Sequence, residues 1–210
     1  MTKVLSVISL QHLSWIKNSL LLISLAFVLS ACVGKGPKTQ YYGLFASSNS
    51  SAIASNTGTH KSIGIGPVIL PDYLDNPAIV TRTSTQQIRV SGYNAWAGDI
   101  TNQMTRVITD NLSSTLKNDA VWGFPWDTRS RPEYQIRIVV EEFSGILGQD
   151  ITLRLKWSVL NTKTQELVNV NRDELTVSSA DSSYNSYVKA LNTVLNDWSQ
   201  MLAKELSSSL

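Results

Sequence analysis

Two long segments of the chain carry apolar residues at the spacing of an amphipathic helix. The first runs from about Asp99 to about Lys117, and the second runs from about Ser183 to about Leu206. Asp99 is a favourable N-cap, because its carboxylate can accept a hydrogen bond from the first helical turn. In each segment the apolar side chains form one stripe: Ile100, Met104, Val107, Ile108, Leu112 and Leu116 in the first, and Tyr184, Tyr187, Val188, Leu191, Val194, Leu195, Trp198, Leu202 and Leu206 in the second.

A pattern of period two predicts strands between these helices. From Ile151 to Val159 apolar and polar residues alternate, which indicates one buried and one solvated face, as in an antiparallel sheet. Residues 134–140 alternate in the same way, whereas residues 168–177 change phase, so a bulge is expected near Asn171–Asp173. Shorter apolar runs add strands at 63–70, 79–82, 87–90 and 121–124. The expected fold class is α+β: a mainly antiparallel sheet with two amphipathic helices packed on it.

The N-terminal region has the pattern of a secretory signal. Lys3 and Lys17 precede an apolar run at residues 20–29, which is too short to span a bilayer comfortably. The run ends in Leu29-Ser30-Ala31-Cys32, which resembles the lipobox of bacterial lipoproteins, where the Cys thiol is acylated. The alternative is an N-terminal membrane anchor with an incidental Cys. We expect a lipoprotein signal peptide at residues 1–31 and a covalent lipid, such as palmitate, on Cys32.

Composition divides the rest of the chain into two parts. Residues 32–61 are expected to hold the lipidated Cys, a tether, a short strand near Tyr41–Phe45, and a flexible loop rich in Ser, Thr and Asn. Residues 62–210 are expected to form a single α+β domain.

Charge and cysteine content exclude several classes of protein. The 210 residues include 18 basic and 16 acidic side chains, for a formal net charge of +2. Lys3 and Lys17 belong to the expected signal peptide, so the mature chain is neutral, which argues against nucleic acid as a partner. The single Cys excludes an intrachain disulfide and a Cys-rich zinc site.

Candidate catalytic groups are few. His60 is the only His after the expected signal peptide, and it lies in the Ser/Asn-rich loop, whereas a catalytic triad needs a rigidly held base. Asp72 and Asp75 lie in a Pro-bounded turn, where Asp normally forms the turn itself. Glu141 and Glu142 are adjacent on a strand and are expected to point to opposite faces. We therefore expect no enzyme activity, no metal site, and no cofactor beyond the covalent lipid.

Aromatic side chains beside turns form a candidate interface. Tyr73 lies in the turn between Pro71 and Pro77, and Trp96 precedes the first helix; both are outside the periodic core positions. Stiff turns and aromatic anchors are common at interfaces, so Pro71, Tyr73, Pro77 and Trp96 are interpreted as a possible partner or self-association surface. The alternative is that Tyr73 and Trp96 only cover the ends of the sheet.

Several short motifs, in this order and spacing, resemble those of a known family. They are Ile63-Gly64-Ile65-Gly66-Pro67-Val68, Leu70-Pro71-Asp72-Tyr73-Leu74-Asp75-Asn76-Pro77, Ile79-Val80-Thr81-Arg82, Tyr93-Asn94-Ala95-Trp96-Ala97, and Val121 to Trp126 with its Phe-Pro-Trp turn. With the Tyr-Tyr-x-Leu segment after Cys32, they resemble the ABC-type transport auxiliary lipoprotein family, in particular its PqiC-like (YmbA-like) members, over about residues 41–206. One departure is Ala95-Trp96-Ala97-Gly98-Asp99, where the family commonly has Arg-Trp-Ala-Glu-Pro and a possible ion pair.

The resemblance implies a non-enzymatic role. Such lipoproteins belong to intermembrane transport systems that also contain an inner-membrane protein and a periplasm-spanning protein with MCE domains, and that are implicated in lipid movement and envelope integrity. By the same resemblance, Val33 after the Cys, in place of Asp, favours the outer membrane, facing the periplasm. This chain would dock the MCE-domain partner as a scaffold, and it could form a homo-oligomer.

The rival hypothesis is a periplasmic lipid-binding carrier. A carrier needs a sizeable apolar cavity between sheet and helices. Trp157, Trp198, Tyr184 and Tyr187 would help to fill that space, which favours the scaffold.

Overall fold

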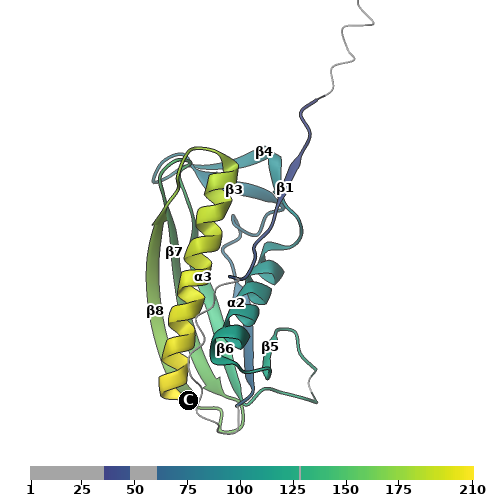
Figure 1. Cartoon of the computed structure of the whole chain (residues 1–210), viewed down its shortest axis with the longest axis vertical. Coiled ribbons are helices and arrows are strands. Elements are labelled where there is room, and N and C mark those ends of the chain that lie inside the picture. The colour runs from purple at the N-terminus through teal and green to yellow at the C-terminus, as the bar shows by residue number, and fades with distance from the viewer. Residues whose placement is uncertain (1–35, 48–60, 128) are drawn as a thin grey trace, which may run out of the picture. The chain divides into compact units, whose positions relative to one another are not determined.

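A helical layer packs on long strands in the computed structural model, which describes residues 36–47, 61–127 and 129–210. One compact unit spans Thr39–Leu210. Figure 1 shows the two labelled helices side by side over the strands. The elements are β1 (Gln40–Tyr42), β2 (Ile63–Ile69), β3 (Ala78–Arg82), β4 (Ile88–Trp96), α2 (Ile100–Leu116), β5 (Val121–Gly123), β6 (Tyr134–Gly145), β7 (Asp150–Asn161), β8 (Leu167–Ser178) and α3 (Tyr184–Ser209).

The strands are divided between two mixed sheets. One has the order β5-β2-β6-β7-β8, and the other has the order β1-β4-β3. Strands β6, β7 and β8 form an antiparallel meander, but β2 is parallel to β5 and β6, and β1 is parallel to β4. The predicted α+β class is confirmed, but both sheets are mixed. Among the described strands, three pairs are antiparallel and three are parallel, and the two longest pairs, β6–β7 and β7–β8, are antiparallel. The parallel pairs were not predicted, including the β1–β4 pair that completes the second sheet, because they join segments far apart in sequence that no turn motif links.

Both helices lie close to their predicted positions. Asp99 caps α2, where its Oδ1 accepts a hydrogen bond from Asn102 N at 2.7 Å. Ser183 caps α3, where its Oγ accepts a hydrogen bond from Ser186 N at 3.1 Å. Helix α2 ends at Leu116, and Lys117 closes it with a left-handed φ of 49°. Helix α3 ends at Ser209, beyond its expected end.

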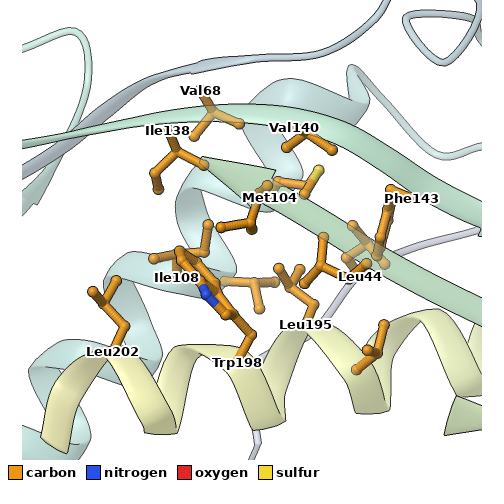
Figure 2. Packing of buried hydrophobic residues seen from close by; sticks show 14 of the residues in the cluster. Leu44, Val68, Met104, Ile108, Ile138, Val140, Phe143, Leu195, Trp198 and Leu202 are labelled. Atoms are coloured by element: carbon orange, nitrogen blue, oxygen red, sulfur yellow. The ribbon is translucent and has the colours of Figure 1, made fainter. Parts of the chain in front are cut away.

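The core lies between the helices and the inner face of the five-stranded sheet. Helix α3 packs on β7 and β8, and α2 packs on β2 and β5. Figure 2 shows Trp198 and Leu195 of α3 close to Met104 and Ile108 of α2, with Ile138 of β6 beyond them. All five side chains have 0% exposure. The stripes that predicted the helices therefore supply the core.

Strand β8 differs from its prediction. Its register against β7 is regular through Asn171–Asp173, so the bulge expected there is wrong; the register shifts instead near Val168. Val168 and Val170 point outward and are 44% and 63% exposed. The change of apolar phase along β8 therefore has another cause than a bulge: Val168 and Val170 lie on the outer face of the sheet.

Polar residues occupy the inner face of β8 at the positions where the apolar pattern fails. Asp173 Oδ2 accepts hydrogen bonds from the indole Nε1 atoms of Trp157 and Trp198, at 2.7 and 2.8 Å. Asn169 and Asn171 donate to a shared oxygen, Oε1 of Glu205 in α3, at 2.8 and 2.5 Å. These bonds tie the edge strand β8 to the rest of the core.

Candidate docking surface

The turn between β2 and β3 is held by local hydrogen bonds. The carbonyl oxygen of Pro71 accepts from Leu74 N at 2.9 Å and from Asp75 N at 3.2 Å. Leu74 is 7% exposed and packs in the core, whereas Pro71 is half-buried and Pro77 is exposed. The predicted turn is thus rigid and in part accessible.

Trp96 lies in the core beneath this turn. It is 7% exposed. Its backbone N–H donates to the carbonyl oxygen of Pro77 at 2.8 Å, so the structure brings these two predicted site residues together. Because its ring is buried, Trp96 supports the turn from within. It also lines a cavity of about 10 Å³, which has room for at most about one water molecule. The other lining residues are Leu70, Leu74, Val80, Ile100, Phe143 and Leu191.

Tyr73 is half-buried and lies beside polar residues of β6. Burial raises the pKa of Tyr73, and the Glu142 carboxylate raises it further, while a hydrogen bond with Ser144 and the nearby Arg82 and Arg154 act in the opposite direction. The phenol is therefore a neutral hydrogen-bonding group at neutral pH. The predicted turn thus meets a charged region that the sequence did not assign to it.

A β-bulge in β6 creates this charged region. The register against β7 shifts between Val140 and Glu142, which makes Glu141 the additional residue. Arg154 Nη2 lies 2.7 Å from Glu142 Oε2, and Arg154 Nε lies 3.6 Å from Glu141 Oε2. The expectation that the two glutamates point to opposite faces is therefore wrong, because the bulge turns both toward Arg154. Glu142 is 6% exposed and also pairs with Arg82 of β3, so it links the two sheets.

Glu141 forms ion pairs with two further basic side chains on the outer face of the sheet. Lys156 Nζ lies 3.0 Å from its Oε1, and Arg172 Nη2 lies 2.5 Å from its Oε2. Hydrogen bonds from Lys156 and Arg172 hold the pKa of Glu141 below its ordinary range. We call Arg82, Glu141, Glu142, Arg154, Lys156, Arg172 and Glu174 the charge cluster.

Two open grooves adjoin the charge cluster. One encloses about 500 Å³ and includes Arg82, Glu142, Ser144 and Gln149 in its lining. The other encloses about 510 Å³ and is lined by Glu141, Arg154, Arg172, Asp173 and Glu174. Since each carboxylate of the cluster is paired with a basic side chain, the arrangement suits polar recognition of a protein surface better than proton transfer. In the part of the chain that the structure describes, no group of three or more His, Cys, Asp or Glu side chains could hold a metal ion.

A second arrangement, which the sequence analysis missed, fixes the N-terminal segment. Residues 43–47 follow β1, and their backbone groups form hydrogen bonds with side chains of both helices. Leu44 N donates to Gln103 Oε1 at 2.9 Å, and Arg106 Nη2 of α2 donates to Leu44 O at 2.9 Å. On the α3 side, Phe45 N donates to Asn192 Oδ1 at 2.7 Å. We call this set the clasp.

The clasp extends the folded unit toward the N-terminus. Leu44 is 0% exposed, and Ser47 N donates to the Oδ1 atoms of Asn111 and Asn196, both at 3.0 Å. The body therefore includes β1 and begins at Thr39, ahead of the boundary expected at residue 62. The available signal was three amides, Asn111, Asn192 and Asn196, on or beside the mainly apolar stripes of the two helices.

Several predictions of the sequence analysis lie outside the described residues. They concern the signal peptide at residues 1–31, the lipidation site Cys32 with Val33 after it, and most of the Ser/Asn-rich loop with His60. Across residues 36–47, 61–127 and 129–210, no helix combines the length and the hydropathy that a membrane span requires.

Comparison with known proteins identifies the family. The model of the family described as "ABC-type transport auxiliary lipoprotein component" matches residues 42–203, more than half of the chain. The chain belongs to this family. It is thus a lipoprotein component of a transport system and a membrane-associated protein of the cell envelope. The family consists of transport auxiliary lipoproteins and is not an enzyme family.

Relatives and solved structures agree with this family. The chain is 24% identical over 185 residues to the intermembrane transport lipoprotein PqiC of Escherichia coli K12, covering 86% of this chain and 93% of that protein, and it matches PqiC of Shigella flexneri equally well. A crystal structure of an uncharacterized protein shares its fold with a TM-score of 0.66 at 22% identity, covering 81% of this chain and 99% of that one. XCC0632 from Xanthomonas campestris gives a TM-score of 0.68 at 16% identity, with 81% and 96% coverage.

Proposed function

We propose that this auxiliary lipoprotein is the outer-membrane-anchored, periplasmic subunit of an MCE-type intermembrane lipid transport system. It acts as a docking and scaffold component that maintains envelope integrity, without enzyme activity or a cofactor. The observation that carries the proposal is the family match across residues 42–203, together with near full-length relatives named intermembrane transport lipoproteins. The partner is a periplasm-spanning protein with MCE domains.

The anchor is a lipid on Cys32. Leu29-Ser30-Ala31-Cys32 follows the apolar run of the signal peptide, and Val33 in the next position supports transfer to the outer membrane. Acyl chains hold a neutral domain on a membrane through apolar burial, at about 0.8 kcal/mol per buried CH₂.

A scaffold fits the packing of the core better than a lipid carrier does. Trp157, Trp198 and Tyr187 are 2%, 0% and 0% exposed and fill the space between sheet and helices. The apolar cavity beneath the turn has a volume of about 10 Å³, whereas ligand pockets usually enclose about 300–1,000 Å³. The two grooves beside the charge cluster reach that size, but they are open and lined by charged side chains, which do not suit an acyl chain. Docking therefore has to use the surface.

The surface we assign to the partner, or to a second copy of the chain, is the turn from Pro71 to Pro77 with the adjoining charge cluster. Tyr73 joins the two, since its hydroxyl forms a hydrogen bond with Ser144 and is affected by the charge of the Glu142 carboxylate. Trp96 has a positioning role there, because its backbone N–H donates to the carbonyl oxygen of Pro77 and it lines the same small buried cavity as Leu74.

Two experiments test this function. Affinity purification of the intact lipoprotein from membranes, followed by mass spectrometry, should recover an MCE-domain protein; partners that lack such a domain would contradict the assignment. Metabolic labelling with palmitate tests the anchor. Cys32→Ser should leave an unlabelled, uncleaved precursor, and persistent label in that variant would disprove lipidation at Cys32.

A further inference from the structure

Two exposed tyrosines share the outward face of the three-stranded sheet. In the parallel β1–β4 pair, Tyr41 lies opposite Ala95, and Tyr42 lies opposite Trp96. Because side chains alternate along a strand, Tyr41 and Ala95 lie on the face opposite to Tyr42 and Trp96, which pack on the core. The register of β4 against β3 shifts between Val90 and Ala95, but Tyr42 OH donates to Asn94 Oδ1 at 3.2 Å, so Asn94 lies on the inner face and its neighbour Tyr93 on the outward one. Tyr41 is 69% exposed and Tyr93 is 53% exposed, so two phenol rings on neighbouring strands are open to solvent.

This face lies close in sequence to the proposed lipid anchor. Thr39, where the compact unit begins, is the seventh residue after Cys32, and seven extended residues span at most about 25 Å. The clasp fixes the chain at Leu44, just after β1. The tether therefore cannot become longer by release of residues after β1. An acylated Cys32 therefore keeps β1 within about 25 Å of the bilayer.

We propose that the face carrying Tyr41 and Tyr93 is a membrane contact, which seats β1 and β4 on the headgroup layer of the bilayer that holds the lipid. This inference rests on the proposed lipidation of Cys32. Tyrosine combines an apolar ring with a polar hydroxyl and is enriched at membrane–water interfaces for that reason. Lys38, in the tether, provides a cation for lipid phosphates. The contact orients a domain that acyl chains alone would leave free to rotate.

A fluorescent probe on the face can detect the contact. The lipidated protein carrying Ala95→Cys, labelled with an environment-sensitive dye, is reconstituted into vesicles of phosphatidylethanolamine and phosphatidylglycerol that contain a headgroup nitroxide lipid. Ala95 lies on the same face as both tyrosines and leaves them in place. The matched control carries the dye at Val170→Cys, an exposed apolar position on β8. We expect quenching at position 95 to exceed quenching at position 170 several-fold.

Substitution of the tyrosines completes the test. In the Ala95→Cys background, Tyr41→Ser with Tyr93→Ser should lower quenching to the level at Val170, while the protein stays bound to the vesicles and its melting temperature changes little. If an acylated protein shows equal quenching at positions 95 and 170, the membrane contact is overturned, whereas the proposed lipidation of Cys32 stands. Loss of a dimer or larger oligomer in the double variant, without a change in quenching, overturns it in favour of a second copy. Intact mass is measured first, because a missing acyl group overturns the lipidation proposal and this inference with it.

Discussion

The two faces of the five-stranded sheet have different chemistry. The inner face lies under α2 and α3, and its polar members, such as Asp173, have partners inside the fold. The outer face bears the charge cluster and exposed valines, such as Val139 and Val170 at 42% and 63%. Burial makes the inner face the source of stability, whereas the outer face can change without creating cavities. Substitutions on the inner face should therefore lower stability most, whereas substitutions on the outer face should lower it less and should alter what the protein binds.

The largest effect is expected from the inner face. Trp198→Ala removes a side chain with 0% exposure, and it should lower the free energy of unfolding by about 3–5 kcal/mol. Val170→Ala on the outer face is the control and should cost less than about 0.5 kcal/mol. Urea unfolding followed by circular dichroism measures both. Similar losses for the two variants would show that the faces do not differ in this way.

The next effect concerns the buried polar partner of the indoles. Asp173→Ala leaves the Nε1 donors of Trp157 and Trp198 without their acceptor, and it should cost about 1–3 kcal/mol. Asp173→Asn retains a side-chain oxygen and should recover a good part of that loss. Thermal unfolding of both variants checks this, and a larger loss for Asn than for Ala would contradict the role of Asp173 as an acceptor.

A smaller effect is expected at the charge cluster. Glu142→Gln leaves Arg82 and Arg154 without their shared carboxylate, at a site where Glu142 is 6% exposed. Because both arginines keep contact with solvent, the loss in unfolding free energy should be about 1–2 kcal/mol. Glu174→Gln, whose side chain is 56% exposed, should change stability by less than about 0.5 kcal/mol. Equal losses would mean that Glu142 does not link the two sheets.

The smallest effect is a dependence on pH. Lys156 and Arg172 lower the pKa of Glu141 from its ordinary value of 4.5, so the ionised carboxylate stabilises the fold above that pH. The stabilisation is lost as pH falls through the lowered pKa. Melting temperatures of the wild type and Glu141→Gln should therefore differ at neutral pH and converge below pH 4.5. A constant difference at every pH would exclude this role.

The sequence predicted those parts of the fold in which local pattern and burial agree. The stripes of α2 and α3 and the alternation of β7 gave the right elements, because each buries one continuous apolar face. The apolar pattern did not reveal the inner face of strand β8. That face carries Asn169, Asn171 and Asp173, whose hydrogen-bond partners are side chains distant in sequence.

The candidate site was predicted only in part, for a related reason. The turn from Pro71 to Pro77 has a local signature, and the structure brings Trp96 to it as a buried support. The charge cluster depends on a bulge at Glu141, which the period of the strand does not encode. The clasp depends on side chains from two helices that meet only in the folded protein.

The central claim is that the outer surface near the turn docks an MCE-domain partner. Photo-crosslinking in living cells tests it most directly, with a photoreactive amino acid at Asp75, which is exposed in the turn, or at Lys189, which is exposed on α3. Both variants should fold and reach the membrane. We expect an adduct that contains the MCE-domain protein from position 75 and none from position 189. An MCE adduct from position 189 alone, or none from either position, would contradict the account.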